Sequence, residues 1–289
     1  MARCALLVTP TNTNAGADDH VYVKAGTYTA TVKVTFAKAG SRSRMLVYEG
    51  FTTTPGDGGQ TTFDITATAT RGFEPNSVNQ TFRNFKLTCS GNVAAWRGFA
   101  PFSSLSVEGL AENVWVTSEA GSTAIGIHIA PGTLWTVVRC RVSMPTAGCI
   151  GAVGQGTVAF WFCVSHDCGL AGFRDRVHAC SLCIGDTAST GAGGTANFHS
   201  AATAGGLQMA FCTSYNASVA NSDGWTEADI SGSTWTYFIG NIFAKYFIHE
   251  HIDLLILYHS TKINQCTMEE REFIDNHPCH APQSFLGQV

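Results

Sequence analysis

The sequence is poor in charged residues. Only 13% of its 289 residues are Asp, Glu, Lys or Arg, and the formal net charge is −4. No basic field is present to hold a phosphate backbone, so we expect no nucleic-acid partner. Thr, Gly, Ala and Ser take the place of the missing charges, which favours β-structure with tight turns over long surface helices. Hydrophobic residues make up 45% of the chain, enough to bury a core.

Long apolar runs are absent too. No stretch of about 18 apolar residues occurs, so we expect no membrane span. The apolar stretch that ends at Val8 is too short for a secretory signal peptide. The chain has 11 cysteines, and without a signal peptide we interpret them mainly as reduced, buried thiols. The motifs of phosphate-binding loops, nucleophile elbows and HExxH metalloproteases are also missing.

What the sequence does contain is a repeat. From Val21 onward, short strand-like segments alternate with Gly, Ser, Thr or Asn, and five middle segments can be laid over one another. A period of roughly 20–30 residues without a helical pattern indicates a solenoid, whose crowded interior suits small Cys side chains. The five segments begin at Trp135, Val158, Asp175, Leu207 and Trp235. Their alignment places Cys140, Cys163, Cys180, Cys212 and Gly240 in one column.

Two segments near the N-terminus carry a family resemblance. Val21-Tyr-Val-Lys-Ala-Gly-Thr-Tyr-Thr resembles the opening coil of right-handed parallel β-helix proteins of the pectate-lyase-like superfamily, and Tyr48-Glu-Gly-Phe-Thr-Thr-Thr-Pro-Gly-Asp-Gly-Gly looks like the loop that often follows it. Such chains are common in phage, other virion and bacterial surface proteins. The superfamily holds lyases, hydrolases, tailspikes and inert stalks, so the resemblance indicates fold better than function.

The resemblance and the repeat together predict an all-β fold, a single right-handed parallel β-helix with irregular N- and C-terminal ends. We expect an N-terminal extension over residues 1–20, the parallel β-helix over 21–266, and a C-terminal tail or cap over 267–289. Because an open β-helix end is an unpaired sheet edge, we expect self-association or neighbouring assembly subunits to cover the ends.

Five triplets with an apolar or small central residue align along one strand of the repeat. Side chains alternate along a strand, so the residues on either side of each centre are expected to face outward. One outward column would contain His128, Val153, Arg174, His199 and Asp229. The neighbouring column would contain Gly126, Gly151, Gly172, Asn197 and Glu227.

Polar groups repeated every ~4.8 Å can follow a polysaccharide, and glycines would leave room for a sugar ring. In a polysaccharide lyase or glycoside hydrolase, Arg174 or His199 would be the base. Asp229 or Glu227 would then be the acid or a Ca²⁺ ligand. The alternative interpretation is an ordinary solvated sheet face. The residues expected to bind the ligand are His128, Asn197, Trp225 and Asp175, with Trp225 as a sugar platform and Asp175 as a further carboxylate for a Ca²⁺ site.

Cysteines at close spacing can also be metal ligands. Cys180 and Cys183 form a C-x-x-C pair close to His178. On a straight strand the two would face opposite sides, so only a bend could direct both at one zinc ion. We therefore predict core thiols and no metal site, with zinc or a redox pair as the alternatives.

These patterns lead to two hypotheses of different class. The first is a non-catalytic structural or receptor/carbohydrate-binding β-helix protein, of virion or surface-appendage type, acting within an assembly. The alternative is a polysaccharide lyase or glycoside hydrolase acting along the exposed face. No cofactor is expected, except Ca²⁺ if the chain is a lyase. The expected location is a virion, the cell surface or the extracellular space.

Overall fold

The fold consists of strands stacked in register. The computed structural model describes residues 15–66, 70–90, 93–101, 108–118, 123–146, 149–155, 157–175, 179–186, 195–201, 208–216, 222–228, 237–239, 241–246 and 252–257. Its regular elements are all β-strands, with no helix in these ranges, so the predicted all-β class is confirmed. No helix in the same ranges is long and apolar enough to cross a membrane.

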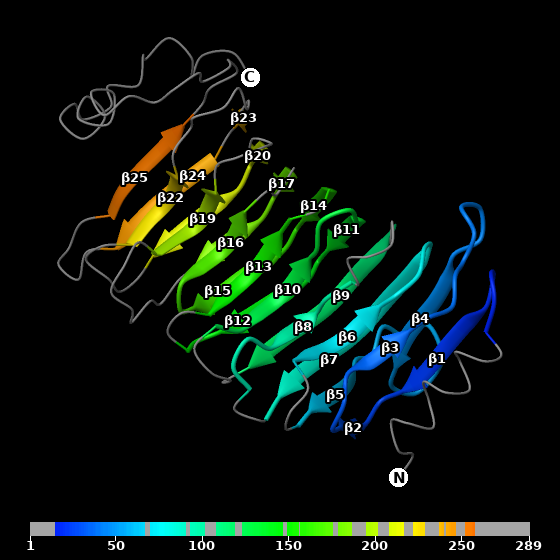
Figure 1. Cartoon of the computed structure of the whole chain (residues 1–289). Coiled ribbons are helices and arrows are strands. Elements are labelled where there is room, and N and C mark those ends of the chain that lie inside the picture. Colours follow the sequence, from blue (N-terminus) through cyan, green and yellow to red (C-terminus); the bar gives the residue numbers. More distant parts are fainter. Residues whose placement is uncertain are drawn as a thin grey trace.

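One side of the solenoid is sheet B, a parallel sheet that follows the order of the chain (Figure 1). Each coil adds one strand, so residues distant in sequence stack at equivalent positions. Its strands are β3 (Val34–Phe36), β6 (Arg71–Pro75), β8 (Arg97–Phe99), β10 (Ile125–Ile129), β13 (Ile150–Gly154), β16 (Ala171–Asp175), β19 (Thr195–Ala201) and β22 (Ser222–Ala228).

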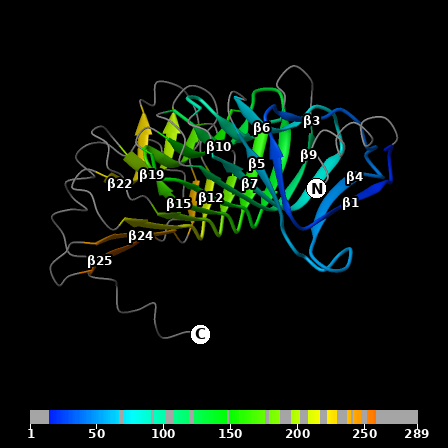
Figure 2. The same ribbon diagram turned by 90° about the horizontal axis from the view of Figure 1, so that it is seen from below.

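The other side is sheet A, in which most coils contribute two strands that meet at a corner. The first row contains β1 (His20–Lys24), β4 (Leu46–Phe51), β7 (Gln80–Cys89), β9 (Glu108–Ser118), β11 (Leu134–Val138), β14 (Thr157–Trp161), β17 (Ala179–Ser181), β20 (Gln208–Ala210) and β23 (Tyr237–Ile239). The long strands β7 and β9 continue into the second row, which also contains β2 (Thr27–Ala30), β5 (Thr61–Ile65), β12 (Arg141–Met144), β15 (Val164–Cys168), β18 (Ile184–Asp186), β21 (Thr213–Asn216) and β24 (Asn241–Tyr246). Figure 2 shows the strands of sheet B along one side and β12, β24 and β25 along the other.

The last described strand reverses direction. β25 (Ile252–Leu257) pairs antiparallel with β24, whereas the other pairings between described strands are parallel. Parallel pairing through successive coils is what the resemblance predicted.

A left-handed residue forms the corner between the two rows of sheet A. In six consecutive coils this residue has a φ between 52° and 60°. We call this set the corner row: Asn84, Asn113, Arg139, Phe162, Leu182 and Phe211. A left-handed residue interrupts the alternation of the strand, so the residues two before and one after the corner both face inward.

The corner explains a correction to the predicted cysteine column. The register aligns Cys140 and Cys163 with Cys183 rather than with Cys180. Leu182 is the corner residue between the two cysteines, and both are fully buried. Cys212 continues the column, and the position after it is Asn241 rather than the predicted Gly240.

The interior changes character along the axis. The N-terminal coils are filled by rings in mutual contact, such as Phe36 with Phe73 at 5.0 Å and Tyr48 stacked on Phe82 at 5.1 Å between centroids. The later coils contain the cysteine column, whose thiols donate to buried carbonyls, as Cys163 does to Val137 at 3.3 Å. All eight cysteines of the described ranges are buried, as the solenoid interpretation predicted.

A row of glycines in sheet B leaves no room for a Cβ between neighbouring coils. A Cβ on Gly98 would lie 2.6 Å from the carbonyl oxygen of Gly126 and 2.3 Å from Val116 Cγ1. The space beside these positions is therefore filled by the next coil and by the core, and is not left open for a sugar ring as predicted. We call this set the glycine row: Gly72, Gly98, Gly126, Gly151 and Gly172.

Candidate functional site

The predicted outward column of sheet B is in register over four coils and then breaks. His128 pairs with Val153, Val153 with Arg174, and Arg174 with His199. The next partner of His199 is Thr226, where Asp229 was expected. The predicted column therefore has Thr226 where the acid was expected to follow the candidate bases. Asp229 itself lies outside the described residues.

His128 is not an exposed ligand-binding residue. Its side chain is buried, at 5% exposure, and its Nε2 lies 3.3 Å from Gln155 Oε1. Burial, together with the positive charges of Arg97 and Arg71, lowers the pKa of His128 to about 4, against the opposing hydrogen bond to Gln155. The ring is therefore neutral at pH 7 and acts as part of the packed wall.

The neighbouring column also differs from the prediction. Asn197 is fully buried and its Nδ2 donates to Ser214 Oγ at 2.8 Å, so it stabilises the interior instead of facing a ligand. Glu227 pairs with Ser200, one position beyond the His199 column. The backbone at Asn197 aligns instead with Gly224, because Trp225 pairs with Phe198.

Two further predicted ligand-binding residues have only a strand position. Trp225 lies within β22 rather than in a loop, in the column of the buried Phe173 and Phe198. Asp175 pairs with Gly154 at the end of β16. Sheet B therefore brings Arg174 and His199 into one column, but does not gather the predicted acids beside them.

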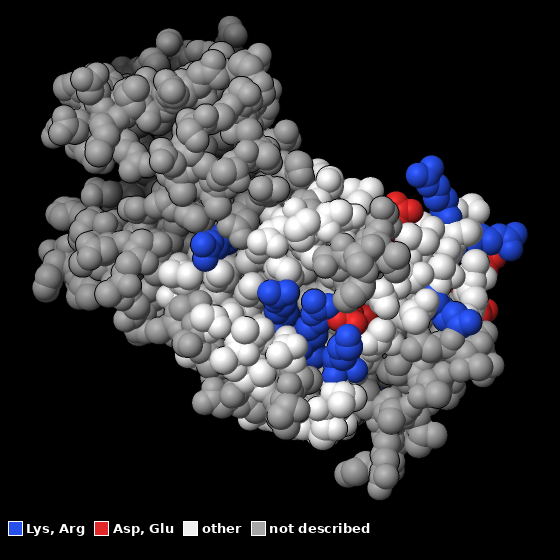
Figure 3. Space-filling view, viewed as in Figure 1, with Lys and Arg blue, Asp and Glu red and all other residues white. Residues whose placement is uncertain are grey.

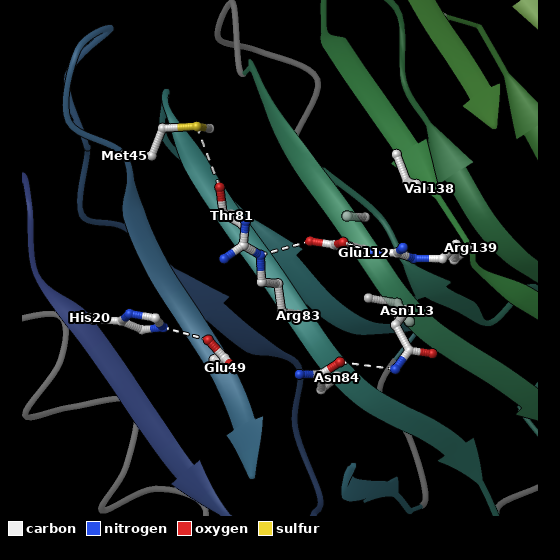
Figure 4. Close-up of polar contacts among 12 residues, drawn as sticks. His20, Met45, Glu49, Thr81, Arg83, Asn84, Glu112, Asn113, Val138 and Arg139 are labelled. Carbon is white, nitrogen blue, oxygen red and sulfur yellow. Dashed lines mark hydrogen bonds and ion pairs between the residues drawn. The ribbon is translucent and has the colours of Figure 1, made fainter. Parts of the chain in front are cut away.

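Charged side chains gather instead on the outer face of sheet A. The register places Tyr22, Glu49, Arg83 and Glu112 in one column on four consecutive coils. Figure 4 shows His20 pointing at Glu49 from β1, and Arg83 pointing at Glu112 from β7. Charges of opposite sign thus alternate along the column at the inter-coil spacing of ~4.8 Å.

The first part of this column is a chain of hydrogen bonds. Tyr22 Oη lies 3.1 Å from His20 Nδ1, and His20 Nε2 lies 2.7 Å from Glu49 Oε2. The two rings also stack, with centroids 4.1 Å apart. Glu49 is nearly buried while Tyr22 is 41% exposed, so the chain leads from the solvent to a buried carboxylate.

The second part is a carboxylate held between two guanidinium groups. Glu112 Oε2 lies 2.8 Å from Arg83 Nε, and its other oxygen accepts from Arg139. With both oxygens engaged by arginine, Glu112 anchors the arginines and leaves an excess of positive charge around it.

An exposed tryptophan lies next to this cluster. Trp115 Nε1 donates to Asn113 Oδ1 at 3.0 Å, and Arg141 lies over the ring at 5.8 Å from its centroid. Asn113 in turn donates to Asn84 Oδ1 at 2.9 Å, one coil away in the corner row. We define the arginine face by Arg83, Glu112, Trp115, Arg139 and Arg141.

The arginine face combines guanidinium donors with a fixed aromatic ring. Figure 3 shows the opposite side of the solenoid, that of sheet B, where Lys and Arg side chains also gather around acidic ones. The described ranges contain no group of three or more His, Cys, Asp or Glu side chains that could hold a metal ion. What the face can do chemically is bind an anion with an apolar ring plane, rather than hold a cation.

Sequence reasoning missed this face, although a signal was present. Arg139 directly precedes Cys140, and Glu112-Asn113-Val114 occupies the same position one coil earlier. Following the residues just before the cysteine column would have found the charges that lie beside it.

Comparison with solved structures identifies the architecture. The pectate lyase Pel9A is similar over 81% of this chain and 69% of its own length, with a TM-score of 0.59 and 15% sequence identity. The chain has a pectate-lyase-like, right-handed parallel β-helix fold. A rhamnogalacturonan lyase gives a TM-score of 0.48 at 12% identity, covering 82% of this chain and 63% of that one.

A viral protein gives a weaker match. ORF18 of Geobacillus virus E2 gives a TM-score of 0.37 at 11% identity, over 87% of this chain and 60% of its own. No family model matches the sequence, and no curated protein is similar to it. At 15% identity the similarity to Pel9A shows the β-helix fold and no activity.

Proposed function

We propose that this β-helix is a non-catalytic, carbohydrate-binding protein of virion or surface-appendage type, acting within an assembly. Its ligand would be an acidic polysaccharide bound along the arginine face. The observation that carries the proposal is the position of Arg139 at the corner and of Arg141 two residues after it, next to Trp115. Arginine suits planar carboxylates, and the ring offers an apolar surface to a sugar.

The repeat of the solenoid supports an extended ligand. Arg83 and Arg139 lie two coils apart, with Glu112 on the coil between them, so guanidinium donors are spaced by about 10 Å along the axis. A polysaccharide chain laid parallel to this axis would meet a guanidinium group at each of these two coils. Glu112 keeps the long arginine side chains oriented, which reduces the entropy lost when a carboxylate binds.

Binding without cleavage is supported by the way the acids are used. A glycoside hydrolase needs two carboxyl groups flanking the scissile bond. Glu49 is bound by His20, and Glu112 by two arginines, with Arg83 between them in the column. Both carboxylates are therefore already bound by basic side chains, and neither is placed to act on a glycosidic bond.

The lyase alternative has one supporting observation. The Tyr22–His20–Glu49 chain is arranged so that a phenol at the surface could pass its proton to an imidazole oriented by a buried carboxylate. If the chain were a lyase, Tyr22→Phe would abolish formation of the unsaturated product. A wild-type protein that binds the polysaccharide without forming this product excludes the alternative.

The test is titration calorimetry with an acidic polysaccharide, polygalacturonate or alginate, and with neutral dextran. We expect binding of the acidic polymers only, weakened as salt screens the charges. Arg141→Gln should raise Kd about tenfold, as expected for loss of one charge-assisted hydrogen bond. The matched control is Arg44→Gln, an exposed arginine paired with Asp18 outside the arginine face. Equal binding by both variants, or equal affinity for dextran, would refute the proposal.

A further inference from the structure

Two neighbouring strands of sheet B begin with the same three residues. Strand β6 begins with Arg71-Gly-Phe and strand β8 consists of Arg97-Gly-Phe. The register pairs Arg71 with Arg97 and Phe73 with Phe99, and both phenylalanines are buried in the core. The two arginines are therefore direct neighbours across the parallel ladder, at the inter-coil spacing of ~4.8 Å. The repeated motif places two like charges on consecutive coils.

The fourth residue of the motif decides which arginine has a partner. After Arg71-Gly-Phe it is Glu74, whose buried carboxylate accepts from Arg71 through Oε2 and lies 2.6 Å from Lys33 Nζ through Oε1. After Arg97-Gly-Phe it is Ala100. Arg97 has no hydrogen bond or ion pair with another residue of the described ranges, although it is half-buried. Its charge is thus partly removed from water without an acceptor, which is unfavourable.

The strand neighbours of Arg97 do not supply a negative charge. Arg71 precedes it in the column and Ile125 follows it. Burial lowers the pKa of Arg97, and the positive charge of Arg71 lowers it further. Both arginines also help to keep the buried His128 neutral, so this ring lies in the same positive field. We define the sheet B cluster by Lys33, Arg71, Glu74, Arg97 and His128 (Figure 3).

We propose that the sheet B cluster binds a tetrahedral oxyanion with two negative charges, a phosphate or sulfate group, at Arg71 and Arg97. The cluster places three cations around one carboxylate, so a dianion would neutralise the remaining positive charge. One guanidinium group can bind both oxygens of a carboxylate, whereas two stacked guanidinium groups match an anion with more oxygens. Glu74 already holds Arg71 in place, which reduces the entropy lost on binding.

This site is separate from the arginine face. The arginine face lies on sheet A, where the carboxylate of Glu112 sits between the guanidinium groups of Arg83 and Arg139. In sheet B the two arginines lie on consecutive coils, with no strand between them to carry such an acid. A bound oxyanion would have the role here that Glu112 has in sheet A. The inference therefore goes beyond the proposed function and does not depend on it.

The experiment is titration calorimetry of the full chain with sodium sulfate, sodium phosphate and sodium acetate, at an ionic strength held constant with sodium chloride. We expect saturable 1:1 binding of sulfate and phosphate and weaker binding of acetate. Arg97→Gln should raise Kd for sulfate at least tenfold, because charge-assisted hydrogen bonds are lost. It should not lower Tm, since it removes a charge without a partner. The matched control is Arg44→Gln, which alters an exposed arginine paired with Asp18 and should leave Kd unchanged.

A second readout is the pKa of His128, followed by NMR of its imidazole ring. Sulfate remains a dianion between pH 3 and 8, and its negative charge should raise the pKa of His128 from about 4. Sodium chloride at the same ionic strength should not, and the effect of sulfate should disappear in Arg97→Gln. A purely structural role of Arg97 would not make this pKa depend on sulfate.

Glucose 6-phosphate and glucose 6-sulfate distinguish two sources of the anion. Tighter binding of these esters than of the inorganic ions supports a group carried on a larger ligand, and the reverse supports a free ion. Absence of saturable binding, equal Kd values for wild type and Arg97→Gln, or acetate bound as tightly as sulfate would each overturn the proposal. Polygalacturonate binding separates the two proposals: Arg97→Gln should retain it, whereas Arg141→Gln should weaken it and still bind sulfate.

Discussion

Replacing Gly126 by alanine tests whether the glycine row is imposed by packing. The added methyl group would lie 2.2 Å from Val142 Cγ1 and 2.7 Å from the carbonyl oxygen of Gly151. The first contact can be relieved by moving a side chain in the core. The second involves the backbone of the next coil, which is held in the parallel ladder between β10 and β13. Overpacking of this kind costs about 1–3 kcal/mol.

A loss of about 2 kcal/mol would lower Tm by about 4–8 °C in a domain of this size. The assay is thermal unfolding followed by circular dichroism and Trp fluorescence. Gly26→Ala is the matched control, because its nearest new contact would be Tyr28 Cε2 at an ordinary 3.7 Å. We expect Gly26→Ala to change Tm by less than a third as much. Equal shifts for the two variants would refute the packing argument, since the methyl group would then be tolerated in the glycine row.

Two predictions concern buried titratable groups. In the unfolded chain His128 is protonated below its ordinary pKa of 6.5, whereas in the folded protein it is protonated only below a pKa of about 4. The free energy of unfolding therefore falls as the pH falls through this window, by on the order of 2 kcal/mol between pH 7 and pH 5. His128→Gln should remove that part of the pH dependence of Tm, and an unchanged slope in the variant would contradict the buried, neutral ring. Burial also raises the pKa of Cys168 to about 12, so iodoacetamide at pH 8 should label this thiol in urea but not in the folded protein. Peptide mass spectrometry measures the labelling, and rapid modification of folded Cys168 would be the opposing result.

The fold was predictable because the solenoid repeats the same local chemistry. Each coil places a small buried residue after the corner, and Cys140, Cys163 and Cys212 mark that position in the sequence. The sequence places Cys180 in the cysteine column where the structure has Cys183, and this error has a local cause. Leu182 is left-handed, so two cysteines three residues apart both face the core, and strict alternation cannot tell which one belongs to the column. Backbone conformation at a single residue is not readable from the hydrophobic pattern.

The site was less predictable because outward columns depend on register alone. The sequence alignment placed the triplet ending at Asp229 beside the triplet ending at His199 because of their polar residues. The structure instead pairs Trp225 with the buried Phe198. An apolar residue at the inward centre of the triplet is the stronger constraint, because burying it contributes more than an exposed acid does. His128 shows a second limit: a residue on the outer side of one sheet can still be covered by the rest of the chain.

The reversal at β25 closes the edge of β24 to further parallel strands. A parallel solenoid is an open-ended polymer in principle, since every coil offers the next the same set of backbone donors and acceptors. β25 occupies that set along Asn241–Tyr246 with the opposite polarity. An additional parallel coil, from this chain or another, therefore cannot pair with β24, because β25 already uses those backbone groups.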